Sequence, residues 1–150
     1  MLERFNRLIN CTWHIDFVGA LACGFCLGAW TELVRDDKGF VLANFIWYVS
    51  LEVAAFAIAA LVLARWSGRA RCALGWLAVL ALGSALSFFS VSAVGAINYG
   101  QRFMGDAWLS YVFERFVEWT LAGVVISLPV MVMVRALYIV IRYRRQRAIG

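Results

Sequence analysis

Four apolar stretches of the sequence are each long enough to cross a lipid bilayer as a helix, and no other feature constrains the fold as strongly. They cover Trp13–Val34, Phe40–Ala64, Ala73–Ile97 and about Phe116–Val134. About 20 helical residues span the ~30 Å hydrocarbon core of a bilayer. Hydrophobic residues make up 64% of the chain and the mean hydropathy is +0.80, which is more than a soluble core needs. The sequence therefore predicts an all-α integral membrane protein whose four transmembrane helices form a bundle.

Basic residues are distributed unevenly between the two ends of these stretches. Ten of the 14 Lys and Arg residues lie before the first stretch, between the second and the third, or at and after the end of the fourth. The other four lie on the opposite side, together with the acidic residues Glu32, Asp36, Asp37, Asp106 and Glu114. Cytoplasmic loops of membrane proteins carry an excess of Lys and Arg, so both termini are predicted to be cytoplasmic.

The same residues suggest a cellular location. Thirteen of the 14 basic residues are Arg, a bias that favours a GC-rich bacterial genome. We therefore predict a multi-pass protein of the bacterial inner (cytoplasmic) membrane.

The predicted organisation is one transmembrane domain with short ends. Residues 1–12 read as an amphipathic segment on the cytoplasmic surface, or else as an extension of the first helix. Residues 13–141 hold the four helices, at about 13–34, 40–64, 73–97 and 107–141, with Asp106 as the N-cap of the fourth. Residues 142–150 form a basic cytoplasmic tail. The loops have no room for a folded soluble domain, so the function is expected in the bilayer or at its faces.

Glu52 lies inside the second apolar stretch, with no other charge in that stretch to neutralise it. A carboxyl group in hydrocarbon is costly and marks a candidate functional site. At the helical rise, Glu52 lies about 20 Å from the cytoplasmic boundary. Asn44 and Tyr48 precede it at intervals of four residues, so the three side chains form one polar stripe along the helix.

The third and fourth helices carry polar residues at the same outer level. They are Ser84 and Ser87 on the third helix, and Tyr111, Glu114, Arg115 and Glu118 on the fourth. If these stripes face inward, they enclose a polar pocket that opens to the outside with Glu52 at its floor. Glu52 and Glu118 are then candidates for binding a proton or a cation. Alternatively, Glu52 is a neutral acid bonded to a neighbouring helix, or it pairs with an Arg of a partner protein.

Small residues recur every fourth position on two of the predicted helices. Ala20, Gly24 and Gly28 form one such face, and Gly123 and Ser127 form another. These faces allow helix backbones to approach closely in lipid. The spacing leaves open whether they meet within one chain or between copies.

Several kinds of chemistry find no support in the sequence. Cys23 and Cys26 form a C-x-x-C, but near the middle of a predicted span they read as packing residues rather than a redox pair. The solitary His14 argues against haem ligation and a histidine metal site. We expect no enzyme activity, no cofactor, no metal and no nucleic-acid partner. The basic tail suits anionic lipid headgroups.

Two functions remain. The first is a small non-enzymatic accessory protein, such as a subunit, assembly factor or regulator of a larger membrane complex. It would dock to another membrane protein through its small-residue faces and buried acids. The expected partners are membrane lipid and another membrane protein, or a second copy of this chain in a homo-oligomer. The second is a small oligomeric transporter or channel in which Glu52 couples movement to a proton or cation.

Overall fold

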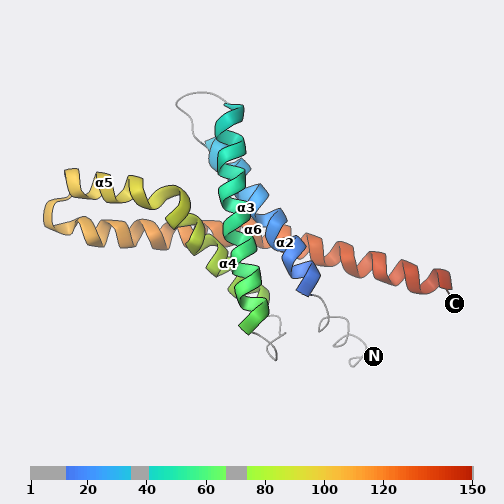
Figure 1. Cartoon of the computed structure of the whole chain (residues 1–150). Coiled ribbons are helices and arrows are strands. Elements are labelled where there is room, and N and C mark those ends of the chain that lie inside the picture. Colours follow the sequence, from blue (N-terminus) through green and yellow to red (C-terminus); the bar gives the residue numbers. More distant parts are fainter. Residues whose placement is uncertain (1–12, 35–40, 67–73, 150) are drawn as a thin grey trace.

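In the computed structural model the described residues are 13–34, 41–66 and 74–149, and they form helices joined by short connections (Figure 1). The elements are α2 (Trp13–Val34), α3 (Leu42–Trp66), α4 (Leu74–Ser87), the π-helical turn η1 (Phe88–Ser92), α5 (Ala93–Phe103), the 3-10 turn η2 (Gly105–Ala107) and α6 (Trp108–Ile149). Four helical stretches are long and apolar enough to cross a membrane: Ile15–Val34, Leu42–Leu63, Gly75–Phe103 and Gly105–Gln146. To this extent the predicted all-α, four-helix architecture is confirmed. The predicted amphipathic segment 1–12 lies outside the described residues.

The helix ends differ from the predicted boundaries. The third apolar helix continues through η1 and α5 to Phe103, six residues beyond the predicted end at Ile97. Asp106 lies inside the 3-10 turn that joins α5 to α6. Gly105 in this turn has a φ of +51°, a left-handed conformation that glycine adopts without a Cβ clash. The turn therefore reverses the chain within a few residues.

The predicted basic tail is not a separate segment. α6 continues to Ile149, so residues 142–149 extend the helix. Arg is among the better helix formers, and positive charge is favourable near a helix carboxyl end.

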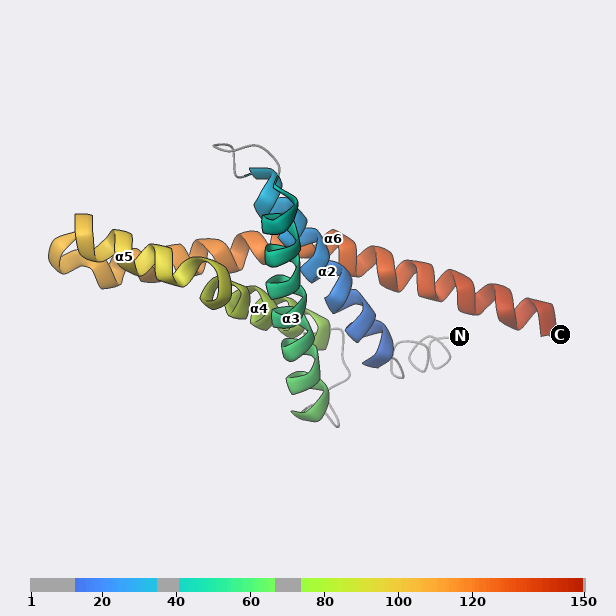
Figure 2. The same ribbon diagram turned by 45° about the horizontal axis from the view of Figure 1, so that its top comes forward.

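The helices are arranged as two crossing pairs. α2 and α3 pack against each other, and α5 lies beside the amino-terminal part of α6 (Figures 1 and 2). Both views show α2 crossing α6 near the middle of its length, and the carboxyl-terminal part of α6 extending beyond the other helices. α2 and α4 pack on α6, whereas α3 packs on α2 and α4.

The hydrophobic core lies where the pairs cross. It draws on α2, α3, α4 and α6, and its buried members are Ala20, Cys23, Leu27, Phe56, Ala60, Val79, Leu80 and Met131. Gly83 of α4 lies against the ring of Phe56, where an added Cβ would come within 2.6 Å of the ring. A small residue at this position lets α4 pack on α3.

Two glycines bring α2 and α3 into close contact. A Cβ on Gly24 would lie 2.7 Å from the carbonyl oxygen of Glu52, and one on Gly28 would lie 2.6 Å from the Cα of Val49. Both distances are below any normal contact with a backbone atom. The face that contains Gly24 and Gly28 is therefore packed inside this chain, against α3.

Glu32 closes the end of this pair at which α2 ends and α3 begins. Its side chain is buried, and Oε1 accepts a hydrogen bond of 3.1 Å from the backbone N–H of Val41. The carbonyl of Val41 in turn accepts the N–H of Phe45 at 2.9 Å, in the first turn of α3. A carboxylate at the amino end of a helix is stabilised by the helix dipole. Glu32 thus has a structural role.

We predict that Gly28→Ala destabilises the fold by about 1–3 kcal/mol, because the added methyl meets the backbone of α3. Gly95→Ala is the matched control, since a Cβ there has no neighbour within 4 Å. It should be neutral or stabilise α5 by about 0.5–1 kcal/mol. Thermal unfolding of both variants in mild detergent measures the difference, and equal effects would contradict the α2–α3 packing.

Candidate functional site

Glu52 lies at the centre of the helix crossing. It is 0% exposed, and its backbone carbonyl faces Gly24 of α2. Neither carboxyl oxygen has a hydrogen-bond partner in the part of the chain that the structure describes. The two ion pairs among the described residues, Arg115–Glu118 and Asp16–Arg135, do not include it. A carboxyl group enclosed in this way is costly to keep ionised.

The side chain nearest to supplying a partner is Ser87 of α4. Its hydroxyl lies beside the carboxyl group of Glu52, although no hydrogen bond of standard geometry joins them. The same hydroxyl oxygen accepts a 2.8 Å hydrogen bond from Nε1 of Trp119 on α6. Because the oxygen of Ser87 is the acceptor in that bond, its own proton remains free to point elsewhere. Trp119, Ser87 and Glu52 therefore form a row across three helices.

Further polar groups lie in the same crossing. Ser84 and Ser127 are fully buried, and neither hydroxyl has a partner among the described residues. Ser84 lies against Gly123, where an added Cβ would come within 2.5 Å of its Oγ. The thiol of Cys23 donates to the backbone carbonyl of Ser127 at 3.3 Å. The side chain of Cys23 is therefore hydrogen-bonded and buried in the hydrophobic core, as expected for a packing residue.

The helix that carries Ser87 is irregular at this point. The π-helical turn η1 begins with the next residue, and the N–H of Ala93 bonds to the carbonyl of Phe88, five residues earlier. The hydroxyl of Ser90 donates to the carbonyl of Ser87 at 3.0 Å. Single π-turns inside α-helices are frequent at functional sites.

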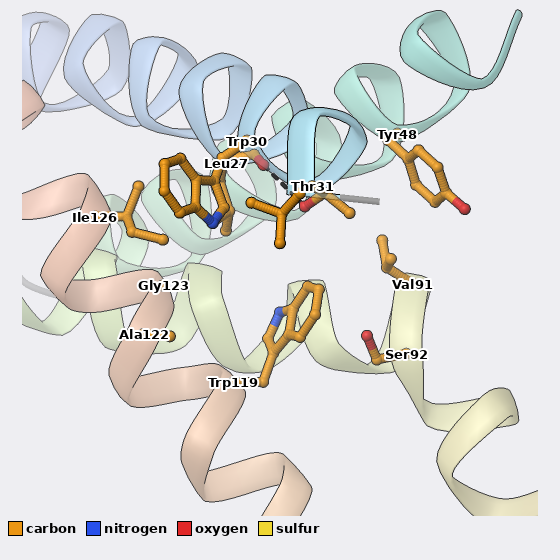
Figure 3. A pocket seen from close by; sticks show the side chains of 11 residues that line it. Leu27, Trp30, Thr31, Tyr48, Val91, Ser92, Trp119, Ala122, Gly123 and Ile126 are labelled. Atoms are coloured by element: carbon orange, nitrogen blue, oxygen red, sulfur yellow. Dashed lines mark hydrogen bonds between the residues drawn. The ribbon is translucent and has the colours of Figure 1, made fainter. Parts of the chain in front are cut away.

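Two pockets open beside this region. The first, of about 370 Å³, lies between α2, η1 and α6 (Figure 3) and is lined by Leu27, Trp30, Thr31, Val34, Tyr48, Val91, Ser92, Trp119, Ala122, Gly123 and Ile126. The second, of about 600 Å³, lies between η1, α5 and α6 and is lined by Phe88, Val91, Ser92, Gly95, Ala96, Tyr99, Tyr111, Arg115, Glu118, Trp119 and Ala122. Trp119 belongs to both linings.

The polar residues predicted to share one pocket are separated in the structure. Tyr48 lines the first pocket, and Tyr111, Arg115 and Glu118 line the second. Ser84 and Ser87 are buried, Asn44 is half-buried and Glu114 is exposed, and these four residues line neither pocket.

Glu52 is not the floor of either pocket. Its side chain is enclosed by the helix crossing and lines neither pocket, whereas the indole of Trp119, which is bonded to Ser87, lines both. Glu118 does not join Glu52. It pairs with Arg115 at 2.8 Å, and its side chain is 63% exposed. The two acids expected to act together are therefore in different environments.

Sequence reasoning missed Trp119. It lies three residues from the predicted start of the fourth stretch at Phe116, where a Trp is also typical of a membrane-interface anchor. The one signal in the sequence is that a Trp N–H turned toward other helices needs an acceptor, which a Ser hydroxyl can provide.

A second missed interaction joins α2 to α6. Asp16 and Arg135 form a hydrogen-bonded ion pair whose side chains are only 31% and 23% exposed, and the guanidinium of Arg135 also lies over the ring of Trp76, 5.8 Å from its centroid. The sequence indicated that both charges lie at the cytoplasmic ends of their helices. Because both residues were predicted at the same level of the membrane, an ion pair between them could have been predicted.

Comparisons with protein families, with curated proteins and with solved structures find no match to this chain. Among the described residues there is no group of three or more His, Cys, Asp or Glu side chains that could hold a metal ion.

We predict that Asp16 and Arg135 couple by about 0.5–2 kcal/mol in a double-mutant cycle of Asp16→Asn and Arg135→Gln, because the pair is largely shielded from solvent. The exposed pair Arg115–Glu118 is the matched control and should show no measurable coupling. Thermal unfolding in detergent provides the four stabilities for each cycle. Additive effects at Asp16 and Arg135 would contradict a contribution of this pair to α2–α6 packing.

Proposed function

We propose that this protein is a multi-pass protein of the bacterial inner membrane with both termini in the cytoplasm. Four helices of sufficient length and hydropathy support the membrane assignment. The concentration of Arg on one side of these helices supports the orientation.

Within that membrane, we propose that the protein is a non-enzymatic accessory of a larger membrane complex. This proposal rests on one observation: α6 continues beyond Arg135 as a helix with an exposed apolar surface. In the proposed orientation, the Asp16–Arg135 pair marks the cytoplasmic boundary, and α6 continues past it with an apolar surface. Leu137 is 60% exposed, and Ile139, Val140 and Ile141 are also exposed. Nothing in the described chain covers this surface, which we call the α6 extension (Leu137–Ile141).

The α6 extension suits another membrane protein better than water. It is flanked by Arg135 on one side and by Arg142, Arg144 and Arg145 on the other. An apolar patch with a basic border fits a partner helix that carries apolar residues and acids at the cytoplasmic interface. Buried acids do not supply this docking surface, since Glu52 is enclosed by the chain's own helices.

We predict that the tagged protein, extracted from its native membrane in mild detergent, carries a stoichiometric second polypeptide. Mass measurement of the purified particle and identification of its components test this. The double variant Leu137→Ala, Ile141→Ala should weaken partner binding about tenfold or more. Val125→Ala is the control, because Val125 is an exposed residue of the same helix on the other side of Arg135. A homogeneous homo-oligomer without a second polypeptide would overturn the accessory proposal.

A second candidate function is a small oligomeric transporter or channel coupled to protons or cations. It is favoured by one observation, the fully buried carboxyl group of Glu52, which has no hydrogen-bond partner of standard geometry among the described residues and lies beside Ser87, the residue to which Trp119 of the two pocket linings is bonded.

We predict for this candidate that Glu52→Gln abolishes ion flux in liposomes while the size of the purified particle is unchanged, because Gln keeps the shape of Glu but cannot ionise. A pH-sensitive dye inside the liposomes measures the flux. Flux that survives this substitution would remove Glu52 from any transport role. Partner retention should be the same for Glu52→Gln and wild type, since the carboxyl group does not reach the α6 extension.

A further inference from the structure

The buried carboxyl group of Glu52 has no charge to balance it in the described chain, and its two oxygens lack hydrogen-bond donors of standard geometry. The titratable group of α2 in this crossing, the thiol of Cys23, is directed to the carbonyl of Ser127. The group of α4 beside the carboxyl group is the neutral hydroxyl of Ser87, and the partner of that hydroxyl on α6 is the neutral indole of Trp119. Of the ligands that would balance a single carboxylate, a proton is the one that needs no additional space.

The route by which a proton could reach this group is defined by Trp119. The second pocket has a polar side, formed by Arg115 and Glu118, and it shares Val91, Ser92, Trp119 and Ala122 with the first pocket. From the wall shared by these pockets, the indole N–H bonds directly to Ser87, and Ser87 lies beside Glu52. Figure 3 shows Trp119 projecting from α6 into the space between Thr31 and Ser92. Along this row, the side chains of Trp119 and Ser87 lie between the two pockets and the buried acid.

The surroundings of Ser87 also offer a means of opening. Ser87 immediately precedes the π-helical turn, and its carbonyl is bonded by the side chain of Ser90. A π-turn is less favourable than continuous α-helix, so a local change of hydrogen bonding there can move Ser87 without unfolding the helix.

We propose that Glu52 is a proton-binding site held in its neutral form, and that the Trp119–Ser87 hydrogen bond gates exchange of its proton with water in the two pockets. When the indole rotates away, the hydroxyl of Ser87 is released and a water molecule can bridge to Glu52. The proton then passes between the carboxyl group and that water, and no other co-reactant is needed. This gate is independent of the α6 extension and of docking to a partner.

Infrared spectroscopy of the detergent-purified protein tests both parts. The difference spectrum of wild type minus Glu52→Gln at neutral pH should contain the carbonyl stretch of a protonated carboxylic acid. After transfer to D₂O this band shifts as the proton is replaced by deuterium, and the rate of the shift measures access of water to Glu52. Absence of the protonated-acid band would overturn the proton site.

The gate is tested by two substitutions that remove the same hydrogen bond from opposite sides, Trp119→Phe and Ser87→Ala. Each should speed the exchange about five- to tenfold, the effect expected for loss of one hydrogen bond. Trp30→Phe is the matched control, because Trp30 lines the first pocket and has no bond to Ser87 among the described interactions. Exchange at the wild-type rate in both test variants would overturn the gate, as would equal acceleration in the Trp30 variant. Size-exclusion profiles show which variants are folded. If Trp119→Phe does not fold, the exchange rate of Ser87→Ala alone tests the gate.

Discussion

The close approach of α2 to α3 at Gly24 and Gly28 is the contact on which the rest of the structure depends. In lipid there is no hydrophobic force between helices, so association relies on close packing and polar contacts. The glycines bring the two backbones into direct contact, and one of the backbone atoms facing Gly24 is the carbonyl of Glu52 itself. Burial of the acid follows from this packing, because α2 covers its backbone and α4 brings Ser87 beside its carboxyl group.

Two costly features coincide at this crossing. Buried oxygens of Glu52, Ser84 and Ser127 lack partners in the described chain, and the helix that carries Ser84 contains a π-turn one residue after Ser87. Native proteins contain few unsatisfied buried polar groups, so a cluster of them calls for a physical explanation. In the proposed site, a proton on Glu52 removes its charge. The proposed movement of Trp119 requires hydrogen bonds that can break and re-form, which explains why the buried polar groups here are not joined in a complete network. The same two features would be a defect if the crossing served only to pack helices.

Hydropathy was sufficient to predict the four apolar helices, since each contains an apolar stretch at least as long as a bilayer is thick. The isolation of Glu52 in its stretch was sufficient to single it out. The contacts of Glu52 were not predictable. Helical spacing places Asn44 and Glu52 on one stripe, but it does not say how far the crossing turns that stripe, and in the structure Asn44 is half-buried while Glu52 is enclosed. The π-turn shifts the positions after Ser87 around the helix axis, so a regular helical period cannot place them. The Trp119–Ser87 bond joins residues 32 apart in the chain, beyond any local pattern.

The position of Trp119 along α6 limits how the proposed gate can move. On its amino-terminal side, α6 is held by ring contacts, with Tyr99 5.4 Å from Tyr111 and Phe88 5.4 Å from Phe116. On its carboxyl-terminal side, the helix is held to α2 through Arg135. A continuous helix fixed at both sides of Trp119 cannot shift far as a whole. Opening must therefore come from rotation of the indole or from rearrangement of the π-turn opposite it, where the backbone hydrogen bonds are already irregular.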